Sequence, residues 1–219
     1  MENTDYEHTG TYKAKNMIIF NLSLQDLLYA VVLGVMGGFI STLIPISEVM
    51  KLIYPFVGGQ QLLSGHHYIW MSVSYGIVRK KSAPIITAAI KGVLESILGD
   101  EWGVFILFMN ILEGTVLALV FWMMEKLHES DTKFGWSIAG GVATFIQAPI
   151  FWGLNGRYGI IENSIMLVAF IFAFISGVLI TGLLGKMVSD LINKSMSKRK
   201  SQIVNTTASK NDKQDNLSN

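Results

Sequence analysis

The residues best suited to chemistry are polar side chains embedded in otherwise apolar stretches. Lys91 and Glu95 lie four residues apart in one stretch, and Asn110 and Glu113 lie three residues apart in the next. Each spacing places both side chains on one face of a helix. Glu113 has no basic residue in its own stretch, and a carboxylate in an apolar setting is costly without a partner. The pattern predicts a binding site for a flat, polar, nitrogen-containing ligand.

Aromatic and amide residues elsewhere in the chain extend this candidate site. Tryptophan faces stack on flat ligands or contact cations, and amides hydrogen-bond to ring nitrogens and amines. The further candidates are Trp70, Gln147, Trp152, Asn155 and the loop residue Gln60 with its neighbour Gln61. Each has a plainer alternative. For Lys91 the alternative is a purely structural role, in which it neutralises Glu95, and His66 and His67 are interpreted as residues at a loop end.

Motifs for ATP hydrolysis and for enzymatic catalysis are missing from the sequence. The nearest approach to a Walker A motif is Gly182-Leu-Leu-Gly185-Lys186, which has the wrong spacing and no Ser or Thr after the lysine. The sequence contains no HExxH or GxSxG motif and no cysteine. We therefore expect no enzymatic activity, no cofactor and no metal ligands. A membrane enzyme that uses Glu95 or Glu113 as an acid or base is an alternative without a supporting motif.

The elements that must position these residues are long apolar stretches. Leu27–Ile46, Phe134–Leu154 and Ser164–Leu184 carry no charged residue, and Gly103–Met124 carries only Glu113. A helix needs about 20 residues to cross a hydrocarbon core of ~30 Å. Of the 219 residues, 51% are hydrophobic and 15% are charged, whereas about 25% charge is usual in a soluble domain. The sequence therefore predicts an all-α, polytopic membrane protein.

We predict six transmembrane helices within a membrane domain that covers residues 24–187. A cytoplasmic or interfacial segment, 1–23, precedes this domain, an outer loop covers 45–65, and 188–219 is expected to be a disordered cytoplasmic tail because it is polar. The predicted helices are Leu24–Leu43, His66–Val78, Ser82–Leu98, Gly103–Met124, Phe134–Leu154 and Ser164–Met187.

Basic residues set the predicted orientation. Arg79-Lys80-Lys81, Lys126 with Lys133, and the Lys186–Lys200 region fall on one side of the six helices. The positive-inside tendency places that side and both termini in the cytoplasm of a multi-pass plasma-membrane protein. Nearly every polar residue within the predicted helices then lies in the outer half of the membrane. A pocket that opens to the outside fits this distribution better than an ion pathway through the full depth.

Small residues repeat at helical spacing in the first apolar stretch. Ala30, Gly34 and Gly38 recur every fourth residue, and such a groove allows close approach of another helix within a membrane. We predict that these three residues dock on a partner helix. The alternative is packing within the chain's own bundle.

The sequence resembles the S components of energy-coupling factor (ECF) transporters, in particular those of hydroxymethylpyrimidine (HMP) or thiamine type. The resemblance covers Leu24 to Met187, departs from the family in having Gly34 where alanine is usual, and does not include the polar tail. The residues that carry it are Ala30-xxx-Gly34, Trp70, Arg79-Lys80-Lys81-Ser-Ala-Pro84, Glu95-Ser-Ile-Leu-Gly99-Asp-Glu-Trp102-Gly103 and Glu113-Gly114.

The resemblance implies a high-affinity substrate-binding subunit of an ECF-type vitamin importer. It implies a ligand site in the outer half of the membrane under a lid formed by the loop after the first helix. The expected ligand is a thiamine precursor or thiamine-like heterocycle. The expected partners are a transmembrane coupling subunit, two ABC ATPases and the lipid bilayer, with no nucleic acid. The main alternative is a self-sufficient secondary transporter of a small polar heterocycle, and a structural assembly subunit is a further one.

Overall fold

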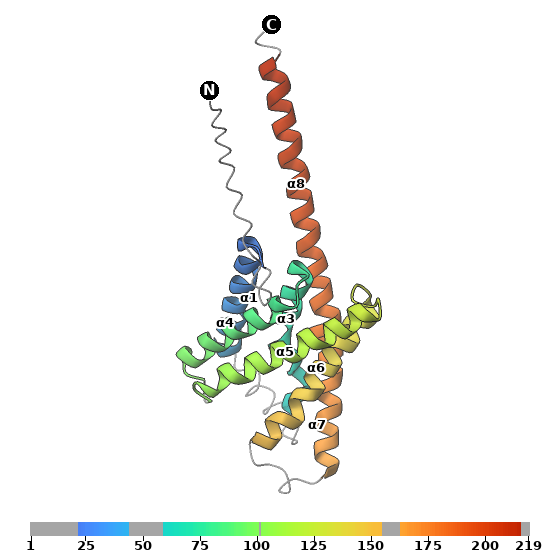
Figure 1. Ribbon diagram of the computed structural model, residues 1–219. Helices are drawn as coiled ribbons and strands as arrows, with labels where there is room; N and C mark the ends of the chain where they lie inside the picture. Colours follow the sequence, from blue (N-terminus) through green and yellow to red (C-terminus); the bar gives the residue numbers. More distant parts are fainter. Residues whose placement is uncertain (1–21, 44–58, 101, 155–162, 216–219) are drawn as a thin grey trace, which may run out of the picture.

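The structure is a computed structural model that describes residues 22–43, 59–100, 102–154 and 163–215 (Figure 1). All regular elements within these ranges are helical, which confirms the predicted all-helical class. They are α1 (Leu24–Leu43), the 3₁₀ helix η1 (Gly59–Leu63), α3 (Gly65–Val78), α4 (Ser82–Leu98), α5 (Phe105–Lys126), α6 (Lys133–Leu154), α7 (Asn163–Ser176), the π-helix η2 (Gly177–Leu184) and α8 (Gly185–Asp215).

The first five predicted helices agree with α1, α3, α4, α5 and α6 to within two residues at each end. The sixth differs, because α7, η2 and α8 follow one another without a break from Asn163 to Asp215. The expectation of a disordered tail from residue 188 onward is therefore wrong as far as Asp215. The physical reason is that no Gly or Pro occurs between Lys186 and Asp215 to end the helix.

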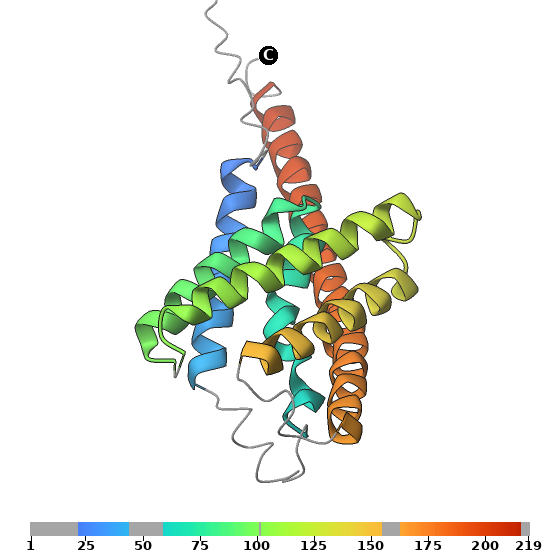
Figure 2. The ribbon, with the colours of Figure 1, turned by 60° about the horizontal axis from the view of Figure 1, so that its bottom comes forward.

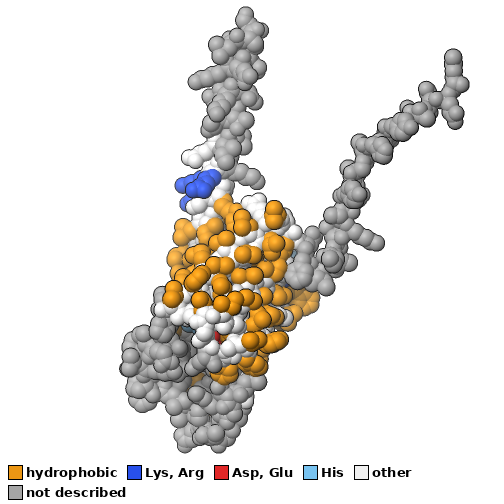
Figure 3. Space-filling model, turned by 90° about the vertical axis from the view of Figure 1, so that its left-hand side faces the viewer, with side chains coloured by type: hydrophobic (Ala, Val, Ile, Leu, Met, Phe, Trp, Pro, Cys, Tyr) orange, Lys and Arg blue, Asp and Glu red, His pale blue; other side chains and the backbone are white. Residues whose placement is uncertain are grey.

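Three helical stretches are long and apolar enough to cross a membrane: Leu24–Leu43, Phe105–Lys126 and Met166–Arg199. Their outward side chains include large apolar residues such as Leu28, exposed to 60%, and Phe108, exposed to 63%. Figure 3 shows apolar side chains over most of the described face, with Lys and Arg gathered where the long helix leaves it. Because a soluble monomer rarely exposes so much contiguous apolar surface, this surface indicates a membrane-embedded protein.

Helix α3 is at the centre of the bundle. It contacts α1, α4, α5, α6, η2 and α8, and Figures 1 and 2 show it enclosed by these helices from both viewpoints. Small residues make this position possible. A Cβ atom added to Gly76 would overlap the side chain of Ser189 on α8, and Ser72 and Ser74 are fully buried. The side chains of α3 therefore meet residues from most of the other helices.

An aromatic core fills one end of the bundle. The Tyr75 ring stacks on Phe121 with ring centroids 4.0 Å apart, and Phe121 meets Trp136 edge-on at 5.0 Å. Trp136 is fully buried, and its indole N–H donates a hydrogen bond of 2.8 Å to the carbonyl oxygen of Ser130. These contacts join α3, α5 and α6.

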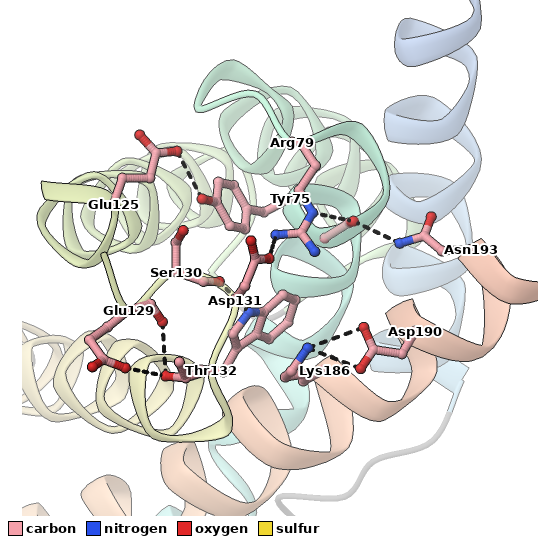
Figure 4. Close-up of polar contacts among 12 residues, drawn as sticks. Tyr75, Arg79, Glu125, Glu129, Ser130, Asp131, Thr132, Lys186, Asp190 and Asn193 are labelled. Carbon is pink, nitrogen blue, oxygen red and sulfur yellow. Dashed lines mark hydrogen bonds and ion pairs between the residues drawn. The ribbon is translucent and has the colours of Figure 1, made fainter. Parts of the chain in front are cut away.

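Polar contacts at the same end tie the helix connections together (Figure 4). The Tyr75 hydroxyl donates to Glu125 Oε1 at 2.8 Å, and Arg79 pairs with Asp131 in the α5–α6 connection. Asn193 Nδ2 on α8 donates to the carbonyl oxygen of Gly76 at 3.1 Å. The end of α3, the α5–α6 connection and α8 thus form one connected polar end.

The small-residue face of α1 packs inside the chain's own bundle. A Cβ atom on Gly34 would lie 2.8 Å from both Ile90 Cβ and the carbonyl oxygen of Thr87. Ala30 is fully buried, its carbonyl oxygen accepts a hydrogen bond of 3.1 Å from Thr87 Oγ1, and Gly38 meets α4 one turn further on. We therefore correct the prediction that Ala30, Gly34 and Gly38 dock on a partner. The helix that approaches α1 closely at these small residues is α4 of the same chain.

Candidate ligand-binding site

Glycines allow α4 and α5 to run side by side at short distance (Figures 1 and 2). A Cβ atom on Gly92 would lie 2.8 Å from the Cα atom of Leu107, and one on Gly114 would lie 2.8 Å from a carbonyl oxygen of α4. The connection between the helices turns at Gly99 and Gly103, whose φ angles of 91° and 53° favour glycine. This approach brings polar residues of the two helices into direct contact.

Lys91, Glu95 and Asn110 form a closed polar unit between α4 and α5. Lys91 Nζ donates to Glu95 Oε1 at 2.6 Å and to Asn110 Oδ1 at 2.7 Å. Asn110 Nδ2 donates to Glu95 Oε2 at 2.7 Å and to the carbonyl oxygen of Ile106 at 2.9 Å. No side chain of the three is more than 2% exposed. The alternative that Lys91 neutralises Glu95 is confirmed, and this pairing uses most of the hydrogen-bonding capacity of Glu95 and Asn110.

Glu113 differs from this unit because no described residue donates a hydrogen bond to its carboxylate. It lies three residues after Asn110 on α5 and is only 7% exposed. It is near enough to Lys91 and Glu95 to interact with their charges. When all three groups are ionised, one ammonium and two carboxylates leave one net negative charge. Because a buried polar group without a partner is costly, Glu113 is the member of the cluster most available to a ligand.

Tyr68 of α3 lies near Glu113 and hydrogen-bonds to α6. Tyr68 interacts electrostatically with Glu113, is 1% exposed, and donates from its hydroxyl to the carbonyl oxygen of Ala143 at 3.3 Å. Gln147 lies one turn beyond Ala143 on α6, and its buried Oε1 atom has no hydrogen-bond partner among the described residues. The structure therefore brings Glu95, Asn110 and Glu113 together and places Gln147 one turn from the residue that Tyr68 contacts.

Sequence reasoning missed two residues at the beginning of α3, His67 and Tyr68. His67 Nδ1 lies 3.5 Å from Lys91 Nζ, so the residue belongs to the buried cluster and not to a loop end. Its neighbour His66 contacts the carbonyl oxygen of Leu63 at 2.7 Å. A signal was available, because His67 is three residues before Trp70 and so lies on the same side of a helix. Within the described ranges, His, Asp and Glu residues form no group that could hold a metal ion.

The other predicted site residues fall into two groups. A Cβ atom on Gly37 of α1 would lie 2.8 Å from Cγ of Trp70, so the Trp70 ring packs at the α1–α3 contact. The second group is beyond what the structure describes. Trp152 belongs to α6 and Gln60 to η1, but their side chains lie outside the described part, and Asn155 lies outside it entirely.

Comparison with known proteins gives one curated relative and one solved structure of similar fold. The relative is "Putative HMP/thiamine permease protein YkoE" of Bacillus subtilis (strain 168), which is 29% identical over 126 residues. This match covers 56% of the chain and 61% of the relative, so it spans less than two thirds of the relative's length. The structure is described as the crystal structure of an S-component of an ECF transporter. It has 19% sequence identity and a TM-score of 0.69, over 83% of this chain and 96% of that one.

A protein-family model described as "ABC-type cobalt transport system, permease component" matches residues 25–146, which is more than half of the chain. The matched region contains α1 to α5 and most of α6, including the closed polar unit and Glu113. The structural likeness to an S component extends the agreement in fold to most of the chain. The protein therefore belongs to the family of ABC-type cobalt transport system permease components and has the fold of an ECF-transporter S component.

Proposed function

We propose that the chain is the substrate-binding subunit of an ECF-type importer and that it takes a thiamine precursor or thiamine-like heterocycle. The observation that carries this proposal is the buried carboxylate of Glu113, which has no hydrogen-bond donor among the described residues. A charge-assisted hydrogen bond from an amine or a cationic ring would satisfy it. The S-component fold and the relative named for HMP and thiamine support the same class of ligand.

In this proposal the residues of the site have different tasks. Glu113 contacts the nitrogen-bearing group of the ligand, and the unpartnered Oε1 of Gln147 accepts a further hydrogen bond. Lys91, Glu95 and Asn110 hold α4 and α5 in register, because their polar atoms bond chiefly to one another. The outer contacts proposed from the sequence are Trp70, Trp152, Asn155 and the lid residue Gln60.

We further propose six spans with both termini in the cytoplasm of the cell that produces the protein. The spans are α1, α3, α4, α5, α6 and the continuous helix from α7 to α8. The supporting observation is that one end of the bundle collects the charged side chains, including the ion pairs of Lys80 with Asp26 at 2.7 Å and of Lys81 with Glu125 at 3.1 Å. A basic end of this kind belongs on the cytoplasmic side.

Energy for uptake is proposed to come from partner subunits, since the sequence has no nucleotide-binding motif. The proposed partners are a transmembrane coupling subunit and two ABC ATPases. Vesicles that contain the full-length chain alone should bind ligand but not concentrate it. Accumulation driven by a proton or sodium gradient in the same vesicles would instead establish the secondary transporter.

The ligand class is tested by titrating the purified full-length protein while its intrinsic tryptophan fluorescence is recorded. Thiamine, hydroxymethylpyrimidine and Co²⁺ are compared, because the family description names cobalt transport. We expect a saturable response to at least one heterocycle and none to Co²⁺. Saturable binding of Co²⁺ without binding of either heterocycle would contradict the proposal.

A further inference from the structure

Helix α8 has a packed face where it leaves the bundle. Ser189 on this face is fully buried. Asn193 Nδ2 donates to the carbonyl oxygen of Gly76, and the Tyr29 hydroxyl donates to the Met196 sulfur at 3.0 Å. These two contacts place residues 193–196 of α8 level with the end of α3 and the beginning of α1. This is the level of the ion-paired end of the bundle.

The opposite face of α8 is exposed and changes abruptly from apolar to basic. Its members follow the spacing i, i+4, i+7, i+11, which keeps them on one side of a helix. They are Met187, Leu191, Lys194 and Lys198, with the two apolar side chains exposed to 54% and 58%. We call these four residues the outward face of α8. Figure 3 shows Lys and Arg side chains gathered where this helix leaves the apolar body.

The two lysines of the outward face carry positive charge that the described part of the chain does not compensate. Most other basic residues at this end have carboxylate partners: Arg79 with Asp131, Lys80 with Asp26, Lys81 with Glu125 and Lys186 with Asp190. No described carboxylate lies within ion-pair distance of Lys194 or Lys198, and both side chains are exposed. These two exposed lysines are therefore open to negatively charged groups that lie outside the described part of the chain.

The depth of these residues indicates the source of that charge. Leu191 belongs to the helical range Met166–Arg199, which contains an apolar window long enough to cross a membrane, and it lies just before Asn193, which is level with the end of α3. At a rise of 1.5 Å per residue, Lys194 and Lys198 lie about 4.5 and 10.5 Å further along the helix. Lysines in this position extend their charged ends to the level of the lipid phosphates. We propose that the outward face of α8 binds the phosphate groups of anionic phospholipids.

The proposal is tested on the full-length protein by energy transfer to labelled lipids. The chain has no cysteine, so Ser195→Cys provides a single site for a donor dye beside the outward face. The protein is reconstituted in phosphatidylcholine vesicles with a trace of acceptor-labelled phosphatidylglycerol or, for comparison, acceptor-labelled phosphatidylcholine. We expect stronger transfer from the donor to phosphatidylglycerol. Lys194→Gln and Lys198→Gln should each lower the ratio of the two association constants by about fivefold at low ionic strength.

Matched variants separate this effect from a general loss of charge. Lys133→Gln removes an exposed lysine at the beginning of α6 and should leave the ratio unchanged. Lys194→Arg with Lys198→Arg keeps both charges and should keep the preference. All variants should bind heterocyclic ligand as the parent protein does, so this test is independent of the proposed function.

Several outcomes would overturn the proposal. One is equal transfer to the two lipids in the parent protein, and another is an undiminished preference after both lysines are changed to glutamine. Displacement of the labelled lipid by inorganic phosphate would indicate a site for soluble anions. If the glutamine variants lose a co-purifying coupling subunit while their lipid preference is unchanged, the outward face is a protein interface.

Discussion

Lys91 Nζ lies 2.6 Å from Glu95 Oε1, one helical turn along α4, and both side chains are almost fully buried. Asn110 of α5 completes this pair by contacting both partners. The pair therefore links two helices as well as two turns of one helix. It leaves Glu113 as the neighbouring carboxylate without a hydrogen-bond donor among the described residues.

Glu95→Gln should destabilise the protein strongly, because it removes the carboxylate that bonds directly to the buried Lys91 ammonium. Breaking a buried ion pair by removing one partner costs about 3–5 kcal/mol. Asp131→Asn is the matched control, since it makes the same chemical change in a pair whose Asp131 side chain is 74% exposed. Thermal unfolding in detergent should show a large loss of stability for the first variant and a change within about 1 kcal/mol for the second. Equal effects would mean that the buried pair has no special structural role.

Gly34→Leu should destabilise the isolated protein, because the first added carbon would lie 2.8 Å from a backbone oxygen of α4. Overpacking of this kind typically costs about 1–3 kcal/mol. Val32→Leu on the exposed side of α1, where Val32 is 47% exposed, serves as the control and should be nearly neutral. If Gly34→Leu keeps full thermal stability but loses a partner subunit, the face would dock on that partner after all.

Thr181→Val should weaken the contact between η2 and α3. The Thr181 hydroxyl donates to the carbonyl oxygen of Gly65 at 2.9 Å, and its loss removes this hydrogen bond between two helices. A cost of about 0.5–1.5 kcal/mol is expected in thermal unfolding. Thr115→Val removes a hydroxyl that bonds only to Ile111 of its own helix, and it should have little effect. Similar stabilities of the two variants would contradict an inter-helix role for Thr181.

The proposed orientation predicts that the two ends of the bundle are accessible from opposite sides of the membrane. The chain lacks cysteine, so Asp100→Cys and Ser201→Cys each give a single reactive site. In right-side-out vesicles, a membrane-impermeant thiol reagent should label the first variant and not the second. Labelling of both on the same side would require an even number of spans between them or a reversed orientation of one part.

The helices could be predicted from the sequence because their ends carry strong local signals. Charges, Gly99 and the basic turn at Arg79-Lys80-Lys81 delimit apolar stretches of suitable length. The tail was different, since its polar composition indicated disorder while its lack of Gly and Pro allowed α8 to continue. Local composition does not show which of these two effects prevails.

The site could be predicted in part. The sequence places Glu95, Asn110 and Glu113 in the same half of the membrane, and the structure brings them together. The sequence does not show that Lys91, Glu95 and Asn110 hydrogen-bond to one another. Those bonds depend on the α4–α5 register, which is set by Gly92 and Gly114. Small-residue spacing likewise predicts a close helix contact at Gly34 without telling whether the neighbour is α4 or another protein.

The central claim is that Glu113 contacts the nitrogen-bearing group of the ligand. The most direct test is the affinity of Glu113→Gln for the heterocycle that the parent protein binds, measured by fluorescence titration of folded protein in detergent. Glu125→Gln is the control on the same helix, because Glu125 bonds to Tyr75 and Lys81 at the other end of α5.

Loss of a charge-assisted hydrogen bond of about 1.5–3 kcal/mol should weaken binding by Glu113→Gln about ten- to a hundredfold. Glu125→Gln should bind as the parent protein does. Unchanged affinity in folded Glu113→Gln would contradict the account and place the ligand elsewhere.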